Sequence, residues 1–177
     1  GVGFLLGSVY TVGTIQTTTA AMRDSVASNG LRTPTLDGLD YYRLYYPDDW
    51  AMIDWMNSNL PYDSVILEGT KGAYWVEGRS SRVSMMTGFP TVMGWVNHEA
   101  QWRGEYFSNL ANRESDIQTI YTTRDWNVAA DLLDRYGITH VIVSSLEREW
   151  YGGIQQNKFD VNMQRIFENN GAVIYQR

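Results

Sequence analysis

The segment DWNVAADLLDRYGITHVIVS, residues 125–144, decides the fold class of this chain. Asp125 is suited to cap a helix over Trp126–Tyr136, where apolar residues recur at helical spacing. Gly137 follows this helix, at the position where helices favour glycine. Thr139–Ser144 is short, apolar and rich in β-branched residues, which is typical of a strand. The segment therefore predicts one helix followed by one buried strand.

A helix followed by a strand is also predicted on both sides of this segment. Upstream, Asp48–Leu60 shows helical spacing of apolar residues and precedes a short apolar strand, Ser64–Leu67. Downstream, Val161–Asn169 is predicted to be a helix and Ala172–Tyr175 the last strand. Strands that are apolar throughout are typical of sheets covered by helices on both faces. We therefore predict an α/β fold with a small, mainly parallel or mixed sheet flanked by helices.

A long segment, Gly69–Thr123, separates these units and shows little periodicity. It is rich in glycine and aromatic residues, and it is predicted to be a loop insertion. Loops longer than about 12–15 residues are usually functional or disordered. Because Trp75, Trp95 and Trp102 fall within it, we expect this loop to be ordered.

Composition excludes several classes of function. The 177 residues carry a net charge of −6, which argues against nucleic-acid binding because that needs a basic surface. The absence of cysteine excludes disulfides, thiolate metal sites and cysteine nucleophiles. The apolar content is that of a chain which folds around a core.

The first residues differ from the rest. Gly1–Ile15 is uncharged, but it is shorter than the roughly 20 apolar residues that a spanning helix needs. It is interpreted either as the end of a membrane helix that starts upstream, which we favour, or as a buried element of a soluble domain. Residues 16–34 form a polar connector, whose few basic residues favour the outer face of a membrane. The α/β domain is predicted to comprise residues 35–177.

No complete catalytic motif is present. His98–Arg103 resembles the first half of a zinc-protease helix, but Trp102 stands where the second histidine would be. The other histidine, His140, starts a predicted strand, where a packed or surface role is expected. Hydrolase elbow, P-loop, dinucleotide-binding and EF-hand patterns are all missing from the sequence. We therefore predict no metal site and assign no catalytic residue.

Arginines and carboxylates supply the candidate ligand-binding residues. Arg79 and Arg82 lie three residues apart, and guanidinium groups suit phosphate and carboxylate ligands, for instance a lipid phosphate. The alternative is that both arginines hold the long loop in place. Glu68 directly follows the first predicted strand, where ligands gather in open α/β sheets. Glu68, Glu99 and Glu147 could serve acid–base chemistry, or each could anchor a loop by pairing with an arginine.

Several segments taken together resemble one family. They are Thr35–Leu39, Tyr46–Asp49, Ile53–Asn57, Val65–Glu68, Gly78–Ser84, Thr87–Trp95, His98–Gly104, Asp116–Tyr121, Leu132–Val141, Ser145–Arg148 and Lys158-Phe159. These segments resemble the C-terminal extracytoplasmic domain of the "YYY" membrane proteins of Chloroflexi and archaea. Those polytopic proteins are similar to type C glycosyltransferases, which use polyprenyl-phosphate-linked sugars. The resemblance covers residues 35–177, and Thr87–Gly104 is its most specific part.

The resemblance implies a place and a role. Residues 1–15 would end the last membrane helix, and residues 35–177 would lie on the extracytoplasmic side of the cell membrane. The domain would help bind an acceptor or a polyprenyl-phosphate-linked sugar for a transfer that the membrane part completes. Type C enzymes usually carry their catalytic acid on an early loop beside the membrane helices, so this chain alone is expected to be inactive. No cofactor is expected in it, and any divalent metal ion would belong to the membrane part.

The resemblance also implies a loop surface that faces the membrane active site. With Glu68 from the sheet edge, the ligand-binding candidates are Arg79, Arg82, His98, Glu99, Trp102 and Arg103. The expected partners are its own upstream helices and a lipid-linked sugar or another membrane protein, with no nucleic acid. An alternative role is a non-catalytic structural or interaction domain of a membrane complex. A further alternative, a free-standing hydrolase, rests only on scattered carboxylates.

Overall fold

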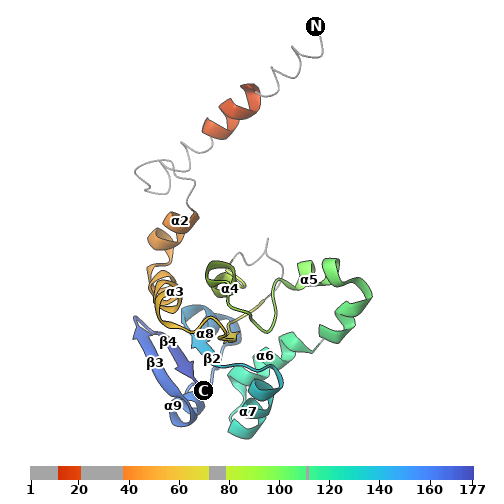
Figure 1. Ribbon diagram of the computed structural model, residues 1–177, viewed down its shortest axis with the longest axis vertical. Helices are drawn as coiled ribbons and strands as arrows, with labels where there is room; N and C mark the ends of the chain where they lie inside the picture. Colours follow the sequence, from red (N-terminus) through yellow and green to blue (C-terminus); the bar gives the residue numbers. More distant parts are fainter. Residues whose placement is uncertain (1–11, 21–37, 72–78, 111) are drawn as a thin grey trace. The chain divides into compact units, whose positions relative to one another are not determined.

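The computed structural model describes residues 12–20, 38–71, 79–110 and 112–177. The chain divides into two compact units, Gly1–Tyr45 and Tyr46–Arg177. The described part of the first unit is helical: residues 12–20 form a helix, and α2 follows at Gly38–Tyr45. The second unit holds the sheet and all the candidate site residues (Figure 1).

The described residues of the second unit form four strands and several helices. The helices are α3 (Pro47–Asn59), α4 (Arg82–Thr87), α5 (Val96–Arg103), the 3-10 helix η1 (Gly104–Leu110), α6 (Arg113–Thr122), α7 (Trp126–Arg135), α8 (Ser145–Tyr151) and α9 (Asn157–Asn162). The strands are β1 (Ile66–Leu67), β2 (His140–Val143), β3 (Gln164–Asn169) and β4 (Ala172–Gln176).

The strands form one mixed sheet in the order β1-β2-β4-β3. β1 runs parallel to β2, with Ile66 opposite His140, whereas β4 runs antiparallel to both β2 and β3. β2 is buried along its whole length, as the sequence 125–144 predicted for its strand. The predicted α/β class, a small mixed sheet flanked by helices, is therefore confirmed.

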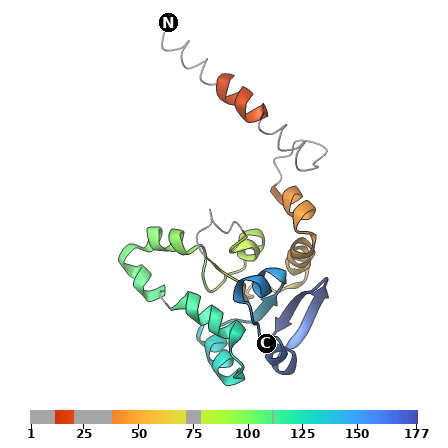
Figure 2. The same cartoon turned by 180° about the vertical axis from the view of Figure 1, so that it is seen from behind.

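Alternating residues of the strands pack against helices on opposite faces of the sheet. One core contains apolar residues of α3, α4 and the sheet, namely Met52, Ile53, Met56, Ile66, Val83, Phe89, Ile142, Ala172 and Ile174. The other contains residues of α6, α7, α9 and the sheet, including Leu67, Ile117, Ile120, Tyr121, Leu132, Leu133, Val141, Val143, Phe159, Val173 and Tyr175. Because strand side chains alternate between faces, neighbours such as Ile66 and Leu67 enter different cores. Figure 2 shows α6 and α7 side by side at the second of these faces.

The helix predicted from residues 125–144 forms as expected. Asp125 is its N-cap, and its side chain accepts a hydrogen bond of 2.8 Å from the amide of Asn127. The helix ends before Gly137, which adopts a positive φ of 61°. The upstream helix and strand are also present, as α3 and β1, although β1 is only two residues long.

The predicted helix Val161–Asn169 is wrong. The chain forms the short helix α9 and then the strand β3, which pairs antiparallel with β4. Asn170 and Gly171 join these strands with φ values of 45° and 86°. Two-residue hairpins of type I′ have positive φ at both central positions, and Asn-Gly is a sequence well suited to them. Pairing with β4 therefore overrides the helical spacing of the apolar residues.

The prediction of a long loop at Gly69–Thr123 is also wrong. This stretch contains α4, α5, η1 and α6, which follow one another along the chain from β1 to α7 (Figure 1). Trp75 lies outside the described residues. Ile117, Ile120 and Tyr121 of α6 are fully buried, so part of the supposed insertion belongs to the core.

The predicted membrane-helix end at residues 1–15 and the connector at 16–34 fall largely outside the described residues. Within them, residues 12–20 are helical and exposed. No helix in the described part of the chain combines the length and apolar character needed to cross a membrane.

Candidate ligand-binding pocket

Arg82, one of the candidate residues, lies in the interior of the second unit. It is 0% exposed, and its guanidinium contacts carboxylates from two other elements. Nε and Nη2 lie 2.9 and 3.3 Å from the Asp49 carboxylate oxygens, and Nη1 and Nη2 lie 3.1 and 3.2 Å from those of Glu147. Nη2 also donates to Ser144 Oγ at 2.9 Å. These contacts satisfy the guanidinium from within the protein, as a buried cation requires.

Glu147 is the most heavily bonded carboxylate of this buried cluster. It accepts hydrogen bonds from the Ser144 amide (2.9 Å), the Ser144 hydroxyl (2.6 Å) and the Gly69 amide (3.0 Å). With Ser144 it forms the capping box of α8, which explains its position one turn into that helix. Burial alone would raise the pKa of Glu147, but the Arg82 charge and these donors lower it to about 2. Glu147 is therefore ionised and structural.

Glu68 approaches the same cluster from the end of β1. Its two oxygens accept from the amides of Val83 and Ser84, each at 2.9 Å, and Oε2 lies 3.9 Å from Arg82 Nη1. Burial raises the pKa of Glu68 above its usual value, against the lowering effect of Arg82 and the two amides. Glu68 thus fixes the first turn of α4 to the sheet edge.

Arg79 lies at the margin of this cluster. Its Nη2 donates to Asp49 Oδ2 at 2.9 Å, and its guanidinium lies 4.3 Å from the centre of the Tyr46 ring. The two arginines of the sequence pair therefore share one carboxylate. Arg79 bonds to Asp49, and Arg82 bonds to both Asp49 and Glu147.

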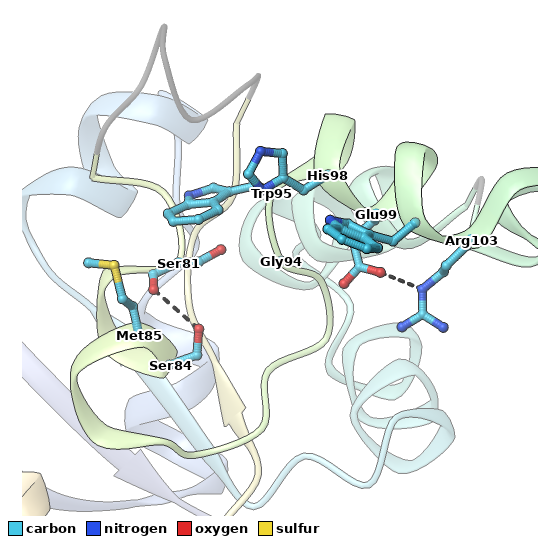
Figure 3. A pocket seen from close by; sticks show the side chains of 9 residues that line it. Ser81, Ser84, Met85, Gly94, Trp95, His98, Glu99 and Arg103 are labelled. Atoms are coloured by element: carbon cyan, nitrogen blue, oxygen red, sulfur yellow. Dashed lines mark hydrogen bonds and ion pairs between the residues drawn. The ribbon is translucent and has the colours of Figure 1, made fainter. Parts of the chain in front are cut away.

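A pocket of about 670 Å³ opens beside this cluster. Its lining comes from α4, α5 and the turn before each, namely Ser81, Ser84, Met85, Gly94, Trp95, His98, Glu99, Trp102 and Arg103. Figure 3 shows Ser81, Ser84 and Met85 on one side, with the Trp95 ring above them, and Glu99 and Arg103 on the other side. Its volume falls within the range of about 300–1,000 Å³ found for small-molecule sites.

Two indole rings give the pocket its apolar surface. Trp95 is held by a hydrogen bond of 2.7 Å from Nε1 to the Ser80 carbonyl, and its ring meets the His98 ring edge-on at 5.4 Å. Trp102 is 83% exposed, which is unusual for so large an apolar side chain. One indole is therefore fixed in place, and the other is open to solvent.

Glu99 and Arg103 form an ion pair one turn apart on α5, through Glu99 Oε2 and Arg103 Nε. Gly94 lies beneath this pair: a Cβ atom at position 94 would lie 3.1 Å from Glu99 Oε1. Such a contact is tighter than carbon and oxygen normally allow, so glycine lets the carboxylate approach the Gly94 backbone. The pair supplies hydrogen-bond acceptors and donors side by side in the pocket.

Ser81, which lines the pocket, has an unusual backbone conformation. It adopts the left-handed conformation, with φ 59° and ψ 26°, directly before α4. Left-handed backbone costs a residue with a side chain about 1–2 kcal/mol. Ser81 is 5% exposed, and its buried Oγ has no hydrogen-bond partner among the described residues. Strain and an unpaired buried hydroxyl at one residue are features that cluster at functional sites.

The structure thus separates the seven candidate residues into two groups. His98, Glu99, Trp102 and Arg103 line the pocket together, whereas Glu68 and Arg82 are buried in the ion cluster and Arg79 borders it. Sequence reasoning missed Ser81, Ser84 and Met85. A positive φ at a serine has no sequence signal, so only the structure could reveal Ser81. His140 is buried in β2, and burial lowers its pKa.

Across the described ranges, no group of three or more His, Asp or Glu side chains is arranged to hold a metal ion. The ion cluster has three carboxylates, but they surround a guanidinium.

Comparisons with known proteins give a similarity of fold only. No family model matches the chain, and no curated protein matches it. Among solved structures, the chain resembles the C-terminal globular domain of an oligosaccharyltransferase from Archaeoglobus fulgidus, with a TM-score of 0.45 and 10% sequence identity. The match covers 72% of this chain and 95% of that chain, and the resemblance is at the coarse level of the fold.

Proposed function

We propose that this domain binds a saccharide in the pocket formed by α4 and α5, as the extracytoplasmic part of a membrane glycosyltransferase of the "YYY" type. The observation that carries the proposal is the combination of two indole rings with the Glu99–Arg103 pair around one cavity. A sugar ring has apolar C–H faces and a rim of hydroxyl groups, so it needs an aromatic face and neighbouring donors and acceptors together.

Each lining group has a task in this proposal. The exposed Trp102 ring covers one face of the sugar, and the fixed Trp95 ring closes the other side of the cavity. Glu99 accepts hydrogen bonds from sugar hydroxyls, while Arg103 donates to them or to the phosphate of a polyprenyl-phosphate-linked sugar. Ser81 and Ser84 complete the pocket wall opposite Glu99 and Arg103.

The sequence resemblance supplies the wider setting of the proposal. The domain lies outside the cell membrane, attached to upstream membrane helices, and it positions an acceptor or a lipid-linked sugar. The membrane part carries the catalytic acid and any divalent metal ion. Binding is therefore the role proposed for this domain, and the chemistry is assigned to the membrane part.

Titration of the 177-residue chain with saccharides tests the proposal. Mono- and disaccharides and a short-chain polyprenyl-phosphate sugar are added, and binding is followed by calorimetry. We expect saturable binding that Trp102→Ala reduces at least about tenfold, because stacking on an aromatic ring is lost. Tyr62→Ala is the matched control, since Tyr62 is an exposed aromatic residue (93%) outside the pocket. Absence of binding, or an equal loss in both variants, would overturn the proposal.

A second role is favoured by one observation. Trp102 and Tyr106 are 83% and 74% exposed on the consecutive helices α5 and η1, and exposed aromatic residues are enriched where proteins meet. In this role the domain docks another membrane protein and performs no chemistry. Saccharide-independent assembly of the full-length protein with a partner, abolished by Trp102→Ala, would favour it.

A further inference from the structure

Another cavity shares no lining residue with the pocket formed by α4 and α5. It has a volume of about 370 Å³, between the connection from α6 to α7 and the helix α9. Two cations line it, Arg124 and Lys158, together with the indole of Trp126 and the amide side chains of Gln155, Asn157 and Asn162. None of these lining residues is acidic, although the chain as a whole has a net charge of −6.

The wall of this cavity is held in place by hydrogen bonds. Lys158 Nζ donates to the carbonyls of Tyr121 and Thr123, each at 2.9 Å, and the Gln155 amide donates to the Tyr121 carbonyl at 2.9 Å. These bonds join α9 to the end of α6. Lys158 is 6% exposed, and its Nζ also lies 4.5 Å from the centre of the Phe159 ring, so its ammonium group borders the cavity from the protein side. The cation is therefore fixed in position before any ligand arrives.

Arg124 is the other cation of this cavity, and no described carboxylate forms an ion pair with it. It is exposed, and it makes no hydrogen bond or ion pair with any residue that the structure describes. The neighbouring carboxylate of Asp125 instead caps α7 by accepting from the Asn127 amide at 2.8 Å. Asp160 on α9 pairs with Arg165 and accepts from Tyr175. The nearby acids are thus engaged elsewhere, and the cavity keeps a net positive lining.

We infer that this cavity is a binding site for the oxyanion of a small molecule, a phosphate or carboxylate group. Arg124 offers its guanidinium fork, which suits both groups, and Lys158 adds a fixed point charge. The half-buried Trp126 indole forms an apolar wall against which the rest of the molecule packs. The volume is near the lower end of the range for small-molecule sites, so it fits a ligand of about one ring. This inference does not depend on the saccharide pocket.

Nuclear magnetic resonance on the 177-residue chain tests the inference. The Trp126 indole N–H is followed while inorganic phosphate, glucose 1-phosphate, glucuronate and glucose are each added. We expect saturable shifts with the three anions and none with glucose. Tighter binding of glucose 1-phosphate or glucuronate than of inorganic phosphate identifies an organic ligand, and equal affinities identify the free oxyanion; both results support the site.

Variants separate the site from general charge effects. Arg124→Ala should weaken anion binding at least about tenfold, because a hydrogen-bonded charge is removed. Arg124→Lys should retain part of the affinity, since the charge remains without the fork. Arg135→Ala, which removes an exposed cation from the other end of α7, is the matched control and should change nothing. Anion shifts that glucose reproduces, or that Arg135→Ala weakens as much as Arg124→Ala does, would overturn the inference.

Discussion

Arg82 and Glu147 lie fully buried against each other, with Nη1 3.1 Å from Oε1 and Nη2 3.2 Å from Oε2. This pair joins the first residue of α4 to the first turn of α8, although the residues are 65 positions apart. Glu147 also accepts from the Gly69 amide just after β1. The ion cluster therefore anchors α4, which carries one wall of the pocket, to α8 and to the end of β1.

Removing one partner of this pair should destabilise the fold strongly. Glu147→Gln leaves the Arg82 charge short of a buried counterion, which typically costs 3–5 kcal/mol. Denaturant unfolding of the second unit measures this cost. Glu149→Gln is the control, because Glu149 is an exposed residue of the same helix. Equal midpoints for the two variants would contradict the structural role assigned to Glu147.

The same pair predicts a pH dependence. The pKa of Glu147 is lowered from 4.5 to about 2 in the folded protein, so its ionised form favours the folded state. Its stabilising contribution is complete above the unfolded pKa near 4.5 and is lost as the pH falls toward 2. The stability difference between the native chain and Glu147→Gln should therefore be largest at pH 6–7 and shrink steadily below about pH 4. A difference that is constant from pH 7 to pH 2.5 would refute this assignment.

Gly94→Ala should weaken saccharide binding without unfolding the domain. The new Cβ would lie 3.1 Å from Glu99 Oε1, so the carboxylate must move away from its place beside Arg103. We expect lower affinity in calorimetry and an unfolding midpoint close to that of the native chain. In a Glu99→Ala background the same change should have little further effect, because the side chain it displaces is gone. Full additivity of the two changes would argue against this mechanism.

The stability of the hairpin between β3 and β4 should depend on the backbone conformation of its turn. Gly171 has a φ of 86°, so Gly171→Ala should destabilise the protein by about 1–2 kcal/mol. Asn170→Gly is the matched comparison, since Asn170 also has a positive φ (45°) and glycine adopts it without strain. Thermal unfolding should show a lower midpoint for the first variant and little change for the second. A loss of similar size in both would mean that the Asn170 side chain, and not φ, controls the turn.

Removing the N-cap of α7 should lower the stability of the protein by a smaller amount than Gly171→Ala does. Asp125→Ala removes the acceptor of the Asn127 amide and should cost about 1 kcal/mol, whereas Asp125→Asn should retain most of the stability. Asp131→Ala changes an exposed residue of the same helix and serves as the control. Chemical denaturation should rank the stabilities in the order native, Asp125→Asn and Asp125→Ala.

Local signals in the sequence predicted local structure well. The helix after Asp125 and the strand after it depend on capping and on nearby apolar residues, so they could be read directly. The helix predicted at Val161–Asn169 is wrong because the Asn170-Gly171 pair forms a turn that pairs this segment with β4 as a strand. That pair was the better signal, because a hairpin turn restricts the backbone more than a few apolar positions do.

The candidate site could likewise be predicted from the sequence only in part. The family resemblance implies the candidates in His98–Arg103, and four of the seven candidate residues share one pocket. Arg82 is another of these candidates, but its partners Asp49 and Glu147 lie 33 and 65 residues away in the chain. Which carboxylate meets which arginine depends on how α3, α4 and α8 pack around the sheet.

The sequence by itself therefore determined the α/β class and the capped helix with its buried strand. These depend on contacts between residues a few positions apart, for which spacing and residue type suffice. Only the tertiary structure decided the order of the strands, the burial of Arg82 and the strained conformation of Ser81 beside the pocket. It also decided that Arg124 and Lys158 line the same cavity. Each of these arises from packing between distant segments, which no local pattern in the sequence records.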